Sequence, residues 1–151
     1  MSITFTNVLK ENILDNLQTI ISTEFNKMPI FYDVEFQERG HTTLINIKVE
    51  TDETTERFNA GQLRRFTLSI RLYQLLQGRV TADHTQKKHI RFTERLRSLL
   101  EQKSNYAVSG VTQWFDGQVE LVSYQPGLDD AEENYTVSEI TFSASIFEQT
   151  T

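Results

Sequence analysis

The chain has 151 residues, of which 38% are hydrophobic and 11% aromatic, so it has enough apolar material for one folded domain rather than a disordered polypeptide. Its formal net charge of −6 argues against broad binding to nucleic-acid phosphates, because surfaces of that kind gather Lys and Arg. It contains no cysteine, which excludes disulfides and every cysteine-based metal or redox site.

The first predicted element is an amphipathic helix from about residue 7 to residue 26. Its apolar residues recur at steps of three and four, which places them on one helical face. They are Val8, Leu9, Ile13, Leu14, Leu17, Ile20, Ile21 and Phe25. Asn7 is a suitable N-cap, and Pro29 prevents the helix from continuing. Because the apolar stripe is wide, we expect this helix to lie under a sheet rather than to be an exposed docking helix.

Three alternating strands are predicted next, at about residues 30–37, 44–51 and 63–74. The residues expected on their buried faces are Ile30, Tyr32, Val34, Phe36, Ile45, Ile47, Val49, Phe66, Leu68, Ile70 and Leu72. Residues 38–41 contain a glycine between polar residues, which predicts a hairpin loop between the first two strands.

Residues 52–61 are predicted to form a long polar connection between the second and third strands. Loops of this length in compact domains are either binding elements or flexible segments, and the sequence leaves both readings open. Phe58 is an unusual residue for a loop that is merely solvated, and it lies beside Glu53, Glu56 and Arg57. We therefore favour an interaction element.

A second helix is predicted from about residue 83 to residue 103. Its apolar arc holds His89, Phe92, Leu96, Leu99 and Leu100, whereas Lys87, Arg91, Glu94 and Ser98 face away and Ile90 falls outside the arc. Five cations, Lys87, Lys88, Arg91, Arg95 and Arg97, make the helix locally positive. Nucleic-acid contact is one reading, but a solvated face or a match to an acidic loop of a neighbouring copy, 52–56 or 129–133, is favoured.

The last third of the chain predicts a hairpin and a long closing strand. Asp116 and Gly117 lie between the alternating segments 111–115 and 118–124, and Asp-Gly is a strong hairpin signal because both turn positions need positive φ. The closing strand spans about residues 135–148 and directs Ile140, Phe142, Ala144 and Ile146 inward. A strand of this length spans roughly 46 Å, against a domain diameter of about 40 Å. Strand ends should therefore project, and a neighbouring subunit is one way to cover them.

These elements predict a single α+β domain over residues 1–151, with a mixed, mostly antiparallel sheet packed against two helices in the order α-β-β-β-α-β-β-β. No stretch approaches the roughly 18 apolar residues of a bilayer span, and the first residues lack the pattern of a secretory signal. We therefore expect a protein made and folded in a cytoplasm.

Residues suited to catalysis are not grouped in any recognisable motif. His84 and His89 are five residues apart, unlike the four-residue spacing of a metalloprotease pair, and His41 falls in a predicted turn, so all three are expected to be surface or boundary residues. The acidic run 129–133 lacks the ligand spacing of a calcium loop and is expected to be solvated. No phosphate-binding glycine motif or Gly-x-Ser-x-Gly elbow occurs. We expect no catalytic residues, metal or cofactor, and thus not an enzyme.

Over about residues 7–148 the chain resembles the tail terminator, or tail completion, proteins of long-tailed bacteriophages. The resemblance rests on the leading helix at 7–26, the strand triplet ending at 66–73, the helix ending at 95–100, the segment 114–122 and the long last strand. It implies a ring, usually of six copies, that caps the head-proximal end of the tail tube and joins it to the neck or connector. Partners implied are further copies, the tube protein, the neck or connector protein and, as a further candidate, the tail sheath. DNA would only pass through the lumen, and the protein would reside in the virion after assembly in the host cytoplasm, with no membrane partner.

The residues that we expect at subunit contacts are Glu53, Glu56, Arg57, Phe58, Arg91 and Arg95. Two other classes of protein remain open. One is another neck or tube-associated component, or a generic adaptor such as a secretion-system tube protein. The other is a small enzyme or ligand binder on a curved sheet, which would need polar groups such as Tyr32, Asp33 and Tyr73 to converge in a pocket.

Overall fold

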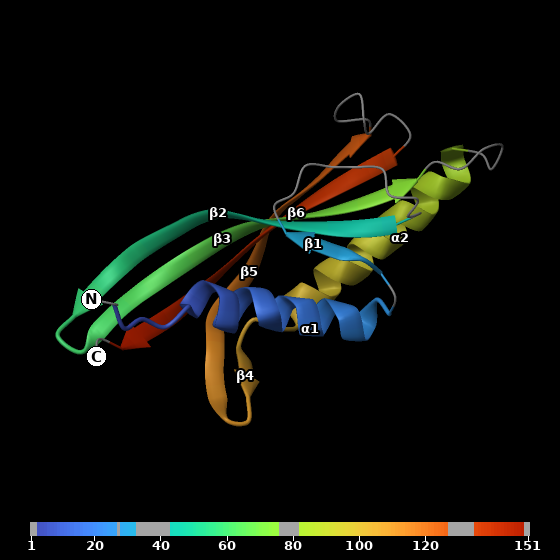
Figure 1. Cartoon of the computed structure of the whole chain (residues 1–151). Helices are drawn as coiled ribbons and strands as arrows, with labels where there is room; N and C mark the ends of the chain where they lie inside the picture. The colour runs from blue at the N-terminus through green and yellow to red at the C-terminus, as the bar shows by residue number, and fades with distance from the viewer. Residues whose placement is uncertain (1–2, 27, 33–42, 76–81, 127–134, 150–151) are drawn as a thin grey trace.

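The computed structural model describes residues 3–26, 28–32, 43–75, 82–126 and 135–149 of the chain. A π-helical stretch, η1 (Leu9–Leu14), leads into α1 (Asp15–Glu24), and α2 (Ala82–Glu101) follows the third strand. The strands are β1 (Ile30–Tyr32), β2 (Thr43–Phe58), β3 (Gly61–Leu75), β4 (Tyr106–Val108), β5 (Val111–Pro126) and β6 (Tyr135–Gln149). They form one sheet in the order β1-β2-β3-β6-β5-β4 (Figure 1). This confirms the predicted α+β class and the order of helices and strands.

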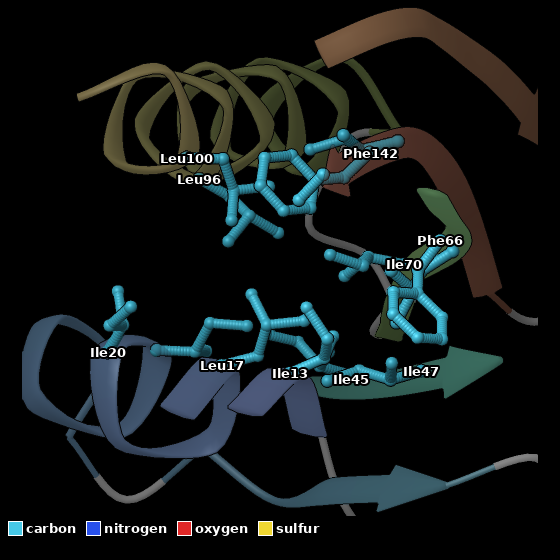
Figure 2. Close-up of a cluster of buried hydrophobic side chains, with 14 of the residues drawn as sticks. Ile13, Leu17, Ile20, Ile45, Ile47, Phe66, Ile70, Leu96, Leu100 and Phe142 are labelled. Atoms are coloured by element: carbon cyan, nitrogen blue, oxygen red, sulfur yellow. The ribbon is translucent and has the colours of Figure 1, made fainter. Parts of the chain in front are cut away.

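Both helices pack on the same face of the sheet and enclose the hydrophobic core. Figure 2 shows Ile13 and Leu17 of the first helix pointing toward Leu96 and Leu100 of α2 and toward the strands. The buried strand residues of this core are Ile45, Ile47, Phe66, Leu68, Ile70, Leu72, Trp114, Ile140, Phe142, Ala144 and Ile146, all of them predicted except the tryptophan. Three other residues predicted on the buried faces, Ile30, Tyr32 and Val49, are only partly buried, and Val34 and Phe36 lie outside the described residues. The apolar stripe of the first helix therefore lies under the sheet, as its width indicated.

The first helix ends at Glu24, before the chain reaches Pro29. Phe25 then leaves the helical conformation with φ −108° and ψ 73°. At the other end, the side chain of Asn7 accepts a long hydrogen bond of 3.4 Å from the backbone N–H of Lys10. Asn7 is thus a weak cap, and Pro29 is not the residue that stops the helix.

The predicted hairpin between the first two strands is wrong, because β1 and β2 run parallel. Ile30 pairs with Ile45, and Tyr32 pairs with Ile47. A tight hairpin joins only antiparallel neighbours, whereas a parallel pair needs a crossover connection. Alternation within a strand says which side chains share a face, but not which way its neighbour runs. The residues predicted to form the loop, 38–41, and the rest of the first strand lie outside the described part of the chain.

The predicted turn at Asp116 and Gly117 is also misplaced. The chain reverses at Ser109 and Gly110, with φ 52° and 81°, so that β4 pairs with β5. Asp116 also has positive φ, 52°, but it lies inside β5, where the pairing with β6 skips from Phe115 to Gln118. This is a β-bulge, and some bulges, like hairpin turns, hold a residue at positive φ. Gly117 is buried there, and a Cβ atom would lie 3.1 Å from Phe142 and from a backbone oxygen.

Candidate interaction surface

The segment predicted as a long loop is instead the outer half of a β-hairpin. Pairing between β2 and β3 continues from Asp52 opposite Phe66 to Phe58 opposite Gly61, and only two residues, 59 and 60, form the turn. The loop prediction for residues 52–61 is therefore wrong. Two bulges explain it, because the register shifts between Val49 and Thr51 and again between Thr54 and Glu56. Each bulge interrupts the alternation by which a strand is recognised.

We call the projecting part of the sheet the arm: residues 51–65 of β2 and β3 with residues 146–149 of β6. Figure 1 shows it extending past the helices at one side of the molecule. The third strand of the arm, β6, lies close to β3 at the tip, where Gly61 is opposite Gln149. A Cβ atom at Gly61 would lie 2.2 Å from the backbone oxygen of Glu148, so only glycine permits this approach. The predicted projection of strand ends is confirmed by this arm.

On the helix side, the arm is held together by polar contacts. The guanidinium of Arg64 lies 2.5 Å from the carboxylate of Asp52 and 2.6 Å from that of Glu148. The hydrogen bond to Asp52 is the main cause that raises the pKa of Arg64 above its ordinary value. Gln62 donates a second hydrogen bond to Glu148, 2.9 Å long. These contacts join all three strands, so the arm is an ordered element with its own cross-strand bonds.

The opposite side of the arm carries exposed aromatic and acidic side chains, and we call it the aromatic–acidic face. The register places Glu53 opposite Arg65, Glu56 opposite Leu63, and Leu63 opposite Phe147. The face consists of Glu53, Glu56, Phe58, Leu63 and Phe147. The rings of Phe58 and Phe147 contact each other with centroids 6.0 Å apart. They nevertheless remain 46% and 43% exposed, which is unusual for a pair of large apolar side chains.

Glu53 has no ion-pair partner among the described residues although it lies opposite an arginine. Arg65 is engaged elsewhere: its guanidinium donates to Ser143 at 2.7 Å and to Ser145 at 2.8 Å, and it pairs with Asp116 at 3.2 Å. This network ties the base of the arm to β5 and β6. It leaves the carboxylate of Glu53 on an exposed surface.

The outer edge of β2 offers unpaired backbone groups along the arm. In the described part of the chain β1 pairs only with residues 45–47 of β2, and β2 continues to Phe58. An open strand edge of this length readily pairs with another chain unless it is covered. The arm therefore combines an open edge with an exposed aromatic pair.

The two predicted contact residues of α2 behave differently from each other. Arg95 binds within its own chain: it donates to the carboxylate of Glu24 at 2.7 Å and to its backbone oxygen at 2.9 Å, and it lies 4.8 Å from the centre of the Phe25 ring. It thus joins α2 to the end of α1, where a cation also meets the negative end of the helix dipole. Arg91 is exposed, next to an Ile90 that is 43% exposed.

The structure thus divides the six predicted contact residues. It brings Glu53, Glu56 and Phe58 together on one face of the arm, and places Arg57, opposite Gln62, on the other face. Arg91 and Arg95 lie on α2, whose first half is at the other end of the molecule (Figure 1).

Sequence reasoning missed several exposed residues and a groove. Phe147 falls in the predicted closing strand, and nothing in the sequence pairs it with Phe58. Other large apolar side chains that are well exposed are Ile3, Phe5, Val111 and Leu121. A groove of about 490 Å³ lies where β5 diverges from the end of β6, lined by residues that include Val8, Gln113, Trp114, Ile146 and Phe147. The alternation of Ile3 and Phe5 with threonines was a signal that could have been noted.

The histidines and tyrosines considered for chemistry do not converge. His89 is fully buried, which corrects its expected boundary position, while His41 and the side chain of His84 lie outside the description. Tyr32 pairs with Ile47 on the helix side, and Tyr73 is buried on the opposite side of the sheet. Asp33 and the acidic run 129–133 also lie outside it. Within the described residues, no three His, Asp or Glu side chains gather in a metal-binding group.

In sequence, the chain matches no protein-family profile and no curated protein. In structure it is similar to a solved protein that carries no functional description, with 13% identity, a TM-score of 0.56 and 96% of each chain covered. It is also similar to a chain in the virion of the native gene transfer agent particle, with 10% identity and a TM-score of 0.50 over 93% of this chain and 90% of that one. At such identities the likeness establishes a shared fold. No described helix is long and apolar enough to span a membrane.

Proposed function

We propose that this protein is a structural virion component that works by assembling with copies of itself, and more specifically that it is a tail terminator. In this role a ring of about six copies caps the head-proximal end of the tail tube. It joins the tube to the neck or connector and lets DNA pass through its lumen. The role requires no catalytic site and no cofactor.

The observation that carries the proposal is the arm. It extends beyond the helices, exposes an aromatic pair and leaves a strand edge open, and these features are typical of a surface covered by another subunit. The similarity in fold to a chain of the gene transfer agent virion supports a structural role in a phage-like particle. The resemblance of the predicted elements to tail terminators supports the finer assignment.

The proposal is tested with the purified full-length chain. Native mass spectrometry should give a closed species near six times the 17.6 kDa chain mass, and electron micrographs should show rings. Added to polymerising tail tube protein, the rings should stop tube growth and sit at one end only. Rings that neither bind tubes nor limit their length would contradict the terminator role and favour another neck component. A monomer that binds a metabolite in a pocket would favour the enzyme class instead.

A further inference from the structure

We infer that the aromatic–acidic face of the arm in one copy docks against the basic face of α2 in the next copy. The basic face is defined here as Lys88 and Arg91, about one turn apart in the first half of the helix, with the half-buried ring of Phe92 beside Lys88. The inference rests on the proposed ring and names the two surfaces that would close it.

The arm contributes carboxylates with no cation of their own. Glu53 and Glu56 are exposed, and neither forms an ion pair with another described residue. In contrast, the nearby acids Asp52 and Glu148 are both held by Arg64. The charges that hold the arm together are thus separate from those it offers to a partner. Two such carboxylates beside each other attract a cationic surface and repel a second acidic one.

The same face contributes apolar surface at the position where a contact would bury it. Phe58 and Phe147 remain 46% and 43% exposed although they contact each other. Aromatic side chains are enriched at protein–protein interfaces relative to the rest of the surface. A partner that matches this face must therefore offer both cations and an apolar side chain.

The first half of α2 offers that combination. Lys88 and Arg91 are exposed, and neither has a carboxylate partner among the described residues. The ammonium of Lys88 lies 5.7 Å from the centre of the Phe92 ring. The half-buried Phe92 supplies the apolar side chain of this face. The arginines of the second half are already engaged within the chain, Arg95 with Glu24 and Arg97 with Glu101. The unpaired cations therefore gather at one end of the helix.

The placement of the two surfaces makes the contact one between different copies. Figure 1 shows the arm at one end of the molecule and the first half of α2 at the other, so that the arm does not reach its own α2. Two arms facing each other would bring four carboxylates together, which disfavours a symmetric dimer through this face. A head-to-tail contact between unlike surfaces generates a ring when its rotation closes. The occupant of the arm is accordingly α2 of a second copy.

Charge exchange in the full-length chain tests the contact. The arm variant carries Glu53→Lys with Glu56→Lys, the helix variant carries Lys88→Glu with Arg91→Glu, and a third variant carries all four changes. Each two-residue variant should raise the dissociation constant between copies at least about tenfold, and the four-residue variant should recover most of the loss. Arg57→Glu, on the other face of the arm, is the matched control and should assemble as the wild type does. Sedimentation and mass photometry measure assembly, and circular dichroism verifies that each variant folds.

The possible outcomes separate this inference from the proposed function. If the wild type forms rings and the folded two-residue variants form them equally well, the docking contact is wrong and the ring stands. If both variants are defective but combining them restores nothing, the two surfaces do not face each other, and the inference fails. A wild-type chain that stays monomeric at all concentrations overturns both. Recovery in the four-residue variant, with Arg57→Glu unaffected, supports the contact as drawn.

Discussion

Burial of His89 should make the stability of this protein depend on pH in a way that one substitution removes. His89 is fully buried on α2, and neither ring nitrogen has a hydrogen-bond partner among the described residues. Its ring meets that of Tyr124 edge-on, with centroids 6.2 Å apart, and Thr93 binds only its backbone oxygen. Desolvation by burial lowers the pKa of His89 from 6.5 to about 4.

The sign and size of the effect follow from this shift. In the unfolded chain His89 takes up a proton near pH 6.5, whereas in the folded chain it does so only near pH 4. Protons therefore favour the unfolded state between these values. The contribution of the neutral imidazole is complete above pH 6.5 and is lost as the pH falls to about 4. The full loss is about 3 kcal/mol, at about 1.4 kcal/mol per pKa unit, which is a large part of the stability of an ordinary domain.

Urea denaturation of the wild type and of His89→Leu at several pH values between 7 and 4 measures this term. Leucine keeps the site apolar and has no proton to bind, so the variant should lose about 3 kcal/mol less than the wild type over that range. Carboxylates that titrate in the same window act equally in both proteins and cancel in the difference. At pH 7 the variant should be at least as stable as the wild type, because it removes a buried imidazole that has no partner among the described residues. Parallel pH profiles would refute the reasoning.

Two further predictions concern the arm and the join between the helices. Gly61→Val should displace the end of β6 from the arm, because the new Cβ atom would lie 2.2 Å from the backbone oxygen of Glu148. Hydrogen exchange should rise in the arm alone, and equal exchange in both proteins would count against the close approach. Arg95→Ala should destabilise the fold by about 1 kcal/mol, because hydrogen bonds to Glu24 and the contact with Phe25 are lost from a half-exposed site. Thermal unfolding that is unchanged in this variant would mean that Arg95 does not join the two helices.

Some of the candidate interaction surface was visible in the sequence. Phe58 indicated an interaction element because an aromatic residue is unusual in a solvated, acidic segment. In the structure this residue is exposed on the arm. Its companion Phe147 could not be found in this way, because the two meet only through the pairing of β3 with β6. The same holds for Arg95, whose basic character was evident but whose engagement by Glu24 depends on how two helices pack.

The local pattern of the sequence was sufficient for elements whose faces differ in polarity throughout. The first helix and β6 are of this kind: Ile13, Leu17, Ile140 and Phe142 recur at the period of their element and are all fully buried. The spacing of apolar residues along a helix or strand shows which of its faces will be buried. The α+β class follows from the order of the helices and strands recognised in this way.

Tertiary structure alone decided the direction of β1, the length of β2 and the place of the turn between β4 and β5. Each of these depends on a neighbouring strand. The direction of β1 is defined only by its parallel pairing with β2, and β2 continues through two bulges because β3 lies beside it. Asp116 and Ser109 both adopt positive φ, but one occupies a bulge and the other a turn. The type of a residue determines which backbone conformations it can adopt. The strand that pairs with it determines whether a residue at positive φ lies in a turn or in a bulge.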